Sequence, residues 1–133
     1  MKTKKQPKPK KIKDKKLKIK SEKEKTAKTN VRTNIPSTWC PGCFNFMIQA
    51  GVEKFLSNKD LEKEKYAIVT GIGCHAKIFD YINLPGLNAL HGRTLPIALG
   101  MKIARPNLNI LVFSGDGDSY AEGMEHTIHA ARY

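Results

Sequence analysis

The sequence predicts an α/β fold with a parallel sheet, preceded by a basic tail. Residues 66–70 and 109–114 are short, apolar and rich in β-branched side chains, which is typical of buried strands. A segment with helical character, residues 94–105, lies between them. Both predicted strands end in glycine-rich turns, at 71–74 and 115–118. Because a strand–helix–strand crossover makes the strands parallel, we expect both turns at the sheet edge where open α/β sheets bind ligands.

The tail carries the whole basic excess of the chain. Residues 1–32 hold fifteen Lys or Arg against three acidic residues, a net charge of +12, whereas residues 33–133 are neutral. The apolar side chains of residues 1–32 are too few to offset the entropic cost of ordering the chain, about 1–2 kcal/mol per residue. We therefore expect residues 1–32 to be disordered, as a solubilising extension or as an arm for nucleic acid, an acidic partner or a membrane surface. No aromatic residue interrupts the lysines, so the tail lacks a stacking platform for single-stranded nucleic acid.

The first helix is expected at residues 44–56, where apolar residues recur at helical spacing. The stripe consists of Ile48, Val52, Phe55 and Leu56. After the strand at 66–70, residues 75–90 are interpreted as a mixed connection that turns at Pro85-Gly86. The longest apolar run is far shorter than a membrane span and no secretory segment is evident, so we expect a cytoplasmic protein without membrane contact.

The second helix is expected to begin at Thr94 as its N-cap and to end before Pro106. The strand at 109–114 follows, and residues 121–132 resume a helical pattern. Two strands are too few for an independent sheet domain of this kind. We therefore expect residues 33–133 to be the N-terminal part of a larger, truncated domain.

Three cysteines, an odd number, argue against a closed disulfide framework. Cys40-Pro41-Gly42-Cys43 has the spacing of a redox motif, but no strand precedes it. A close thiolate pair with a distant third cysteine, Cys74, is typical of iron–sulfur clusters. Zinc is the alternative, with His75 as a fourth ligand, although neighbours such as Cys74 and His75 suit one tetrahedral ion poorly. The chemistry favours the cluster only slightly.

Two further motifs follow the predicted strands. In Gly115-Asp116-Gly117-Asp118, a carboxylate flanked by glycines can reach a divalent cation while the bare backbone approaches a diphosphate. A simple turn is the alternative. His91 and Arg93, just before the second helix, suit a site for carboxylate substrates. The alternative is that both residues hold a loop in place.

These motifs, taken in order, resemble the beta subunit of the 2-oxoacid:ferredoxin oxidoreductases, over about residues 36–133. The matching segments are Trp-Cys-Pro-Gly-Cys at 39–43, Gly-Ile-Gly-Cys at 71–74, His-Gly-Arg at 91–93, Gly-Asp-Gly-Asp at 115–118 and the helix at 127–132. Two residues depart from the family pattern: Phe44 stands where Gly is usual, and His75 replaces a small residue beside the cofactor.

The resemblance implies a partial thiamine-diphosphate-binding fold. It also implies oxidative decarboxylation of a 2-oxoacid to an acyl-CoA, together with an alpha subunit, coenzyme A and ferredoxin. The implied residues are Ile72, Gly73, Cys74, His75, Gly117 and Asp118 for thiamine diphosphate; Asp116 for Mg²⁺; Cys40, Cys43 and Cys74 for a 4Fe–4S cluster; His91 and Arg93 for catalysis; and Lys77 for the substrate. The alternatives are a non-redox thiamine-type remnant with structural zinc, or a basic nucleic-acid-binding module acting through the tail.

Overall fold

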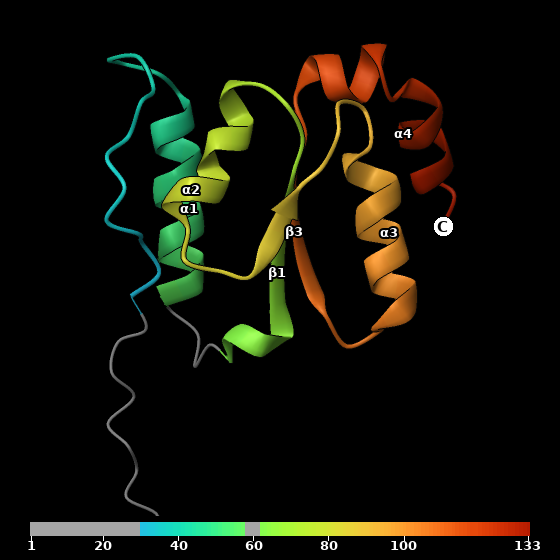
Figure 1. Cartoon of the computed structure of the whole chain (residues 1–133), viewed down its shortest axis with the longest axis horizontal. Helices are drawn as coiled ribbons and strands as arrows, with labels where there is room; N and C mark the ends of the chain where they lie inside the picture. Colours follow the sequence, from blue (N-terminus) through green and yellow to red (C-terminus); the bar gives the residue numbers. More distant parts are fainter. Residues whose placement is uncertain (1–29, 58–61) are drawn as a thin grey trace, which may run out of the picture.

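The computed structural model describes residues 30–57 and 62–133. It has three layers, with the sheet in the middle (Figure 1). The helices α1 (Asn45–Ser57) and α2 (Ile78–Tyr81) lie on one side, and α3 (Thr94–Ala104) and α4 (Met124–Ala130) lie on the other. The predicted α/β class is confirmed. The disorder expected over residues 1–32 falls outside the described residues for 1–29, and only residues 30–32 of that segment are described.

The sheet contains three parallel strands in the order β2-β1-β3. Their bounds are Tyr66–Thr70 for β1, Gly86–Asn88 for β2 and Asn109–Phe113 for β3. The expected parallel pairing of β1 with β3 is confirmed, with Ile68 opposite Leu111. Since both strands run in the same direction, their carboxyl ends and following loops share one edge of the sheet.

Strand β2 corrects the interpretation of residues 75–90 as a connection with only a turn. Gly86 pairs with Ile68 of β1, and a Cβ on Gly86 would lie 1.9 Å from the carbonyl oxygen of Ile68. The bare glycine therefore lets this segment approach the sheet. A three-residue strand that begins with glycine has too little apolar pattern to be recognised from the sequence.

The helices differ from the expectations at two points. Thr94 is not the N-cap of α3: Arg93 occupies that position, and Thr94 is the first helical residue, 1% exposed. The expected helix at 121–132 is shortened to α4, and a break separates α4 from a π-helical turn at Gly117–Ala121. The division falls beside Gly123, where a Cβ would lie 2.4 Å from the carbonyl oxygen of Asp118. Among the described residues, no helix is both long and apolar enough to cross a membrane.

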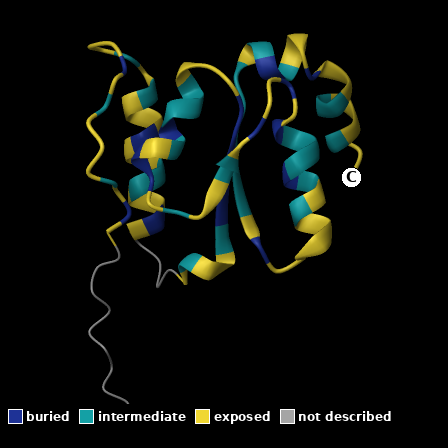
Figure 2. Cartoon of the chain, viewed as in Figure 1, coloured by how far each residue is buried: buried dark blue, intermediate teal, exposed yellow. Residues whose placement is uncertain are grey.

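Two hydrophobic clusters cover the two faces of the sheet, as expected when successive strand residues point in opposite directions. The strand between them, β1, is buried over most of its length (Figure 2). Ile68 lies in the cluster under α1 and α2, whereas Val69 lies in the cluster under α3. Val31 belongs to the first cluster and is 6% exposed. The ordered core therefore begins before residue 33, where the sequence analysis placed the start of the domain.

The apolar stripe predicted on α1 is buried only in part. Leu56 is fully buried and Val52 packs against the core, but Ile48 is 50% exposed and Phe55 is 48% exposed. Helix α1 thus turns a narrower face to the sheet than its sequence pattern predicts.

Strand β3 pairs with β1 along one side, and no other strand of the described segments pairs with it. A groove of about 500 Å³ lies beside β3 and α3. The groove is lined from both faces of the sheet, by Tyr66 and Leu111 on one and by Leu95, Ala98 and Ile110 on the other.

Candidate functional site

Loops at the carboxyl ends of all three strands meet around one cleft of about 500 Å³. The lining residues come from the loops after β1, β2 and β3: Ile72, Gly73, Cys74, His75, His91, Gly115, Asp116 and Gly117. Cys74 and Asp116 therefore share one site, as the parallel strands predicted. Six residues that the sequence analysis linked to the cofactor or to Mg²⁺ are among those lining it.

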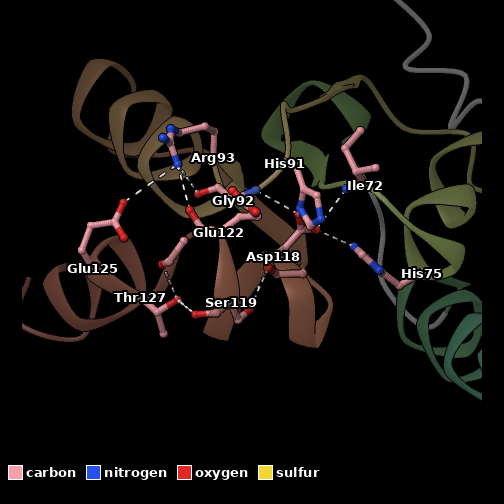
Figure 3. A network of polar contacts seen from close by, with 12 residues as sticks. Ile72, His75, His91, Gly92, Arg93, Asp118, Ser119, Glu122, Glu125 and Thr127 are labelled. Carbon is pink, nitrogen blue, oxygen red and sulfur yellow. Dashed lines mark hydrogen bonds and ion pairs between the residues drawn. The ribbon is translucent and has the colours of Figure 1, made fainter.

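Asp118 lies at the centre of a polar network behind this cleft (Figure 3). Its side chain has no exposed surface. Oδ1 accepts hydrogen bonds from the backbone N–H of Gly92, at 3.0 Å, and from Nδ1 of His91. Oδ2 accepts a 3.0 Å hydrogen bond from the backbone N–H of Ile72. One buried carboxylate thus joins the loops after β1, β2 and β3.

His75 completes this network. Its Nε2 lies 3.0 Å from Oδ2 of Asp118, at ion-pair distance but without the alignment of a hydrogen bond. The other edge of the ring lies over Gly115, where a Cβ would be 2.7 Å from both Nδ1 and Cε1. His91 lies similarly beside Gly117, where a Cβ would be 3.3 Å from Cε1 and 3.6 Å from Nε2. The two imidazoles therefore flank the turn that carries Asp116.

The pKa of Asp118 reflects two opposing effects. Burial would raise the pKa of the carboxyl group, because a charge loses its hydration. The hydrogen bonds from Gly92, His91 and Ile72 and the electrostatic attraction of the nearby His75 imidazole outweigh this effect, so the pKa lies below its ordinary value. Asp118 is consequently an anion at neutral pH.

The structure separates the two aspartates that the sequence analysis assigned to metal and cofactor. Asp116 is exposed in the cleft, where its carboxylate can reach a ligand. Mg²⁺ takes one or two protein carboxylates and fills its other positions with water and phosphate oxygens, so a single exposed aspartate between glycines fits it. Asp118, in contrast, is turned away from the cleft and occupied by four partners.

Two other predicted residues do not line the cleft. Arg93 donates a 3.1 Å hydrogen bond to the carbonyl oxygen of Glu122, and its guanidinium lies 3.9 Å from Glu125 (Figure 3). It holds the loop after β2 against α4, which is the alternative that the sequence left open for this residue. Lys77 lies one turn beyond Cys74, and its Nζ donates to the carbonyl oxygen of Thr38 at 3.4 Å.

All three cysteines are free thiols; Cys40 and Cys74 are exposed and Cys43 is half-buried. Nε1 of Trp39 donates a 2.6 Å hydrogen bond to the carbonyl oxygen of Cys74, which brings the Cys40–Cys43 loop to the loop after β1. Within residues 30–57 and 62–133, no three Cys, His, Asp or Glu side chains form a preassembled metal site. Three free thiols on neighbouring loops suit a thiolate-bound cluster, although they are not gathered around one point.

Comparison with known proteins gives consistent matches. Residues 71–133 match the family described as thiamine pyrophosphate enzyme, C-terminal TPP binding domain. The 2-oxoglutarate synthase subunit KorB of Archaeoglobus fulgidus is 41% identical over 98 residues, which is 74% of this chain and 36% of the relative. The 2-oxoacid:ferredoxin oxidoreductase subunit beta of Saccharolobus solfataricus is 43% identical over 96 residues, which is 71% of this chain and 32% of the relative.

A solved structure, the 2-oxoglutarate:ferredoxin oxidoreductase from Magnetococcus marinus with 2-oxoglutarate, coenzyme A and succinyl-CoA bound, is similar with a TM-score of 0.72 at 35% identity. The match covers 75% of this chain and 34% of that chain. The chain spans about a third of the length of the relatives that it matches.

The parallel sheet, the cleft at its carboxyl edge and the family match of residues 71–133 define the class of protein that the chain is similar to, the thiamine pyrophosphate enzymes. Within this class the chain is similar to the beta subunits of the 2-oxoacid:ferredoxin oxidoreductases. The family resemblance inferred from the sequence motifs is confirmed.

Proposed function

We propose that this chain supplies part of the thiamine diphosphate site of a 2-oxoacid:ferredoxin oxidoreductase, which decarboxylates a 2-oxoacid oxidatively and forms an acyl-CoA. The observation that carries the proposal is the shared cleft of Cys74 and Asp116. The packing of a simple α/β core does not require an exposed carboxylate and an exposed thiol from different strands to share one cleft. Their meeting suits an enzyme whose organic cofactor reacts close to an electron acceptor.

In this proposal the cofactor lies along the lining of the cleft. Asp116 holds Mg²⁺, and the backbone of Gly117 lies against the diphosphate, where a bare glycine permits close approach. Ile72, Gly73 and Cys74 line the side of the cleft that follows β1. When bound, thiamine diphosphate supplies the carbanion chemistry that decarboxylation of a 2-oxoacid requires. The protein residues orient the cofactor and limit the access of water.

The proposed 4Fe–4S ligands are Cys40, Cys43 and Cys74. Support comes from their free thiols and from the bond of Trp39 to the Cys74 loop. A zinc site made with His75 has less support, since that imidazole lies against Gly115 and Asp118. Because Cys74 belongs both to the cleft and to the proposed cluster, electrons from the substrate would travel only a short distance.

Substrate contacts are proposed at the side of the cleft that the loop after β2 forms. His91 lines the cleft and is the better candidate for contact with the reacting group, whereas Arg93 acts on the loop that carries it. The similar structure binds 2-oxoglutarate, coenzyme A and succinyl-CoA. For this chain we propose a 2-oxoacid and coenzyme A as substrates. We propose an alpha subunit and ferredoxin as protein partners.

The test uses the native assembly, purified without oxygen through an affinity tag on this chain. We expect thiamine diphosphate and iron in the preparation, the broad visible absorbance of thiolate-bound iron, and reduction of ferredoxin that requires both a 2-oxoacid and coenzyme A. Asp116→Asn is expected to remove bound thiamine diphosphate while the iron remains. Zinc in place of iron, or an assembly that lacks the cofactor, would contradict the proposal.

A further inference from the structure

The carboxylate of Asp118 meets two imidazoles that both line the cleft. Oδ1 contacts Nδ1 of His91, and Oδ2 lies 3.0 Å from Nε2 of His75. The sequence motifs alone do not indicate that Asp118 contacts two histidines, because Asp116 and Asp118 stand in the same turn and nothing in the sequence distinguishes them. A buried carboxylate that holds two histidines at the rim of a cleft determines how their rings are presented.

An ionised carboxylate only accepts hydrogen bonds, so the facing ring nitrogens must carry the protons. For His91 this places hydrogen on Nδ1. For His75 it favours hydrogen on Nε2, since a lone pair at 3.0 Å from Oδ2 would be repelled by the charge. The backbone N–H groups of Gly92 and Ile72 bind the same two oxygens and hold the carboxylate in place.

The remaining nitrogen of each neutral ring then has a lone pair. In His75 it is Nδ1, which lies over Gly115, and in His91 it is Nε2, which lies beside Gly117. These two glycines stand directly before and after Asp116, and the two histidines, the two glycines and Asp116 all line the cleft. Two acceptor nitrogens thus lie beside the two glycines that precede and follow the exposed Asp116.

We propose that Asp118 is a positioning residue that fixes opposite tautomers of His75 and His91, so that each ring offers an acceptor to the cleft on either side of Asp116. The ligand class that suits this arrangement is a hydrated divalent cation on Asp116. Mg²⁺ keeps several of its waters, and those waters donate hydrogen bonds to acceptors around the carboxylate. The cation role rests on the proposed function, whereas the tautomers do not depend on it.

The first experiment measures the tautomers directly. The 133-residue chain is labelled with ¹⁵N in its histidines, and long-range ¹H–¹⁵N spectra are recorded at a pH of about 8, above the ordinary pKa of histidine. We expect the proton of His91 on Nδ1 and that of His75 on Nε2. The exposed His129 provides a reference ring from the same chain. A proton on Nε2 of His91 would overturn the proposal without any mutation.

The variant Asp118→Asn sharpens the measurement. An amide offers one acceptor oxygen and one donor nitrogen in place of two acceptors, so it can no longer serve both rings. If the amide oxygen stays with His91 and Gly92, its nitrogen faces His75, whose proton is then expected to move to Nδ1. The matched control is Asp116→Asn on the same turn, which should leave both tautomers unchanged. Unchanged tautomers in Asp118→Asn would contradict the positioning role.

A second readout uses the tagged native assembly and Mg²⁺ itself. The Mg²⁺ concentration needed for half-saturation of thiamine diphosphate binding is expected to rise about 10- to 100-fold in Asp118→Asn, the range seen when residues behind a metal ligand are changed. An unchanged Mg²⁺ requirement would overturn the cation role of the two histidines. Correct tautomers in an assembly without thiamine diphosphate would instead remove the proposed function and leave the positioning role intact.

Discussion

Nε1 of Trp39 donates a 2.6 Å hydrogen bond to the carbonyl oxygen of Cys74. The indole is 7% exposed and packs edge-to-face against Tyr81 and Phe46, with ring centroids 4.8 and 5.3 Å away. Through this single side chain, the segment ahead of α1 is fastened to the loop after β1. The relative position of Cys40 and Cys74 therefore depends on a tryptophan that carries no ligand itself.

Trp39→Phe is expected to lower the free energy of unfolding by about 1–3 kcal/mol, since it leaves a carbonyl oxygen without its donor and removes ring volume. Iron content of the native assembly should fall as well, because the two cysteine loops are no longer held together. Phe46→Leu keeps the indole bond and is the control. Equal iron in both variants would contradict the role of Trp39.

Gly71→Ala is expected to destabilise the fold by about 1–3 kcal/mol through overpacking. Its Cβ would lie 1.8 Å from Oδ2 of Asp118 and 2.6 Å from Oγ1 of Thr94, both in buried side chains. The matched control is Gly51→Ala within α1, where a Cβ meets nothing within 4 Å. That change should stabilise the helix by about 0.5–1 kcal/mol. Urea unfolding of both variants distinguishes them by sign.

Asp118→Ala and Asp116→Ala should differ strongly in stability. Removal of the Asp118 carboxylate leaves the buried N–H groups of Ile72 and Gly92 without an acceptor, which we expect to cost about 3 kcal/mol. Asp116 is exposed, so its replacement should change stability by no more than about 0.5 kcal/mol. Denaturant midpoints without Mg²⁺ provide the measurement, and similar losses would contradict the separation of the two residues.

Lys77→Ile tests the proposal that this lysine favours a substrate with a second carboxylate. In the native assembly, kcat/KM for 2-oxoglutarate should fall about tenfold relative to that for pyruvate, the effect of losing one charged hydrogen bond. Lys77→Arg keeps the charge and should preserve the preference. If Lys77 serves only its hydrogen bond with Thr38, both substrates will be affected equally, and the substrate role is then wrong.

The sequence was sufficient for the parts of the fold that depend on local apolar pattern. Strands β1 and β3 were predicted within one residue, because each is an uninterrupted apolar run between breakers. Strand β2 was not, because its place in the sheet comes from the close approach of Gly86 to Ile68, which is a tertiary contact. The division of the last helix has a similar origin at Gly123.

For the candidate site, the parallel-strand argument correctly brought Cys74 and Asp116 to one cleft. It did not distinguish Asp116 from Asp118, since both stand in one glycine-rich turn and the sequence pattern does not indicate which of the two is buried. The π-helical turn at Gly117–Ala121 turns Asp118 inward, where backbone donors from two other loops meet it. Such a junction of three loops leaves no periodic signal in the chain.

The groove beside β3 has a practical consequence for the isolated polypeptide. One row of backbone N–H and C=O groups on that strand has no ladder partner among the described residues, and the neighbouring side chains are mainly apolar. Unpaired edge strands of this type form hydrogen bonds with strands of other molecules. Preparations of the 133-residue chain should therefore self-associate increasingly with concentration, and Asn109→Lys, at an exposed position of β3 in the groove, should suppress that aggregation.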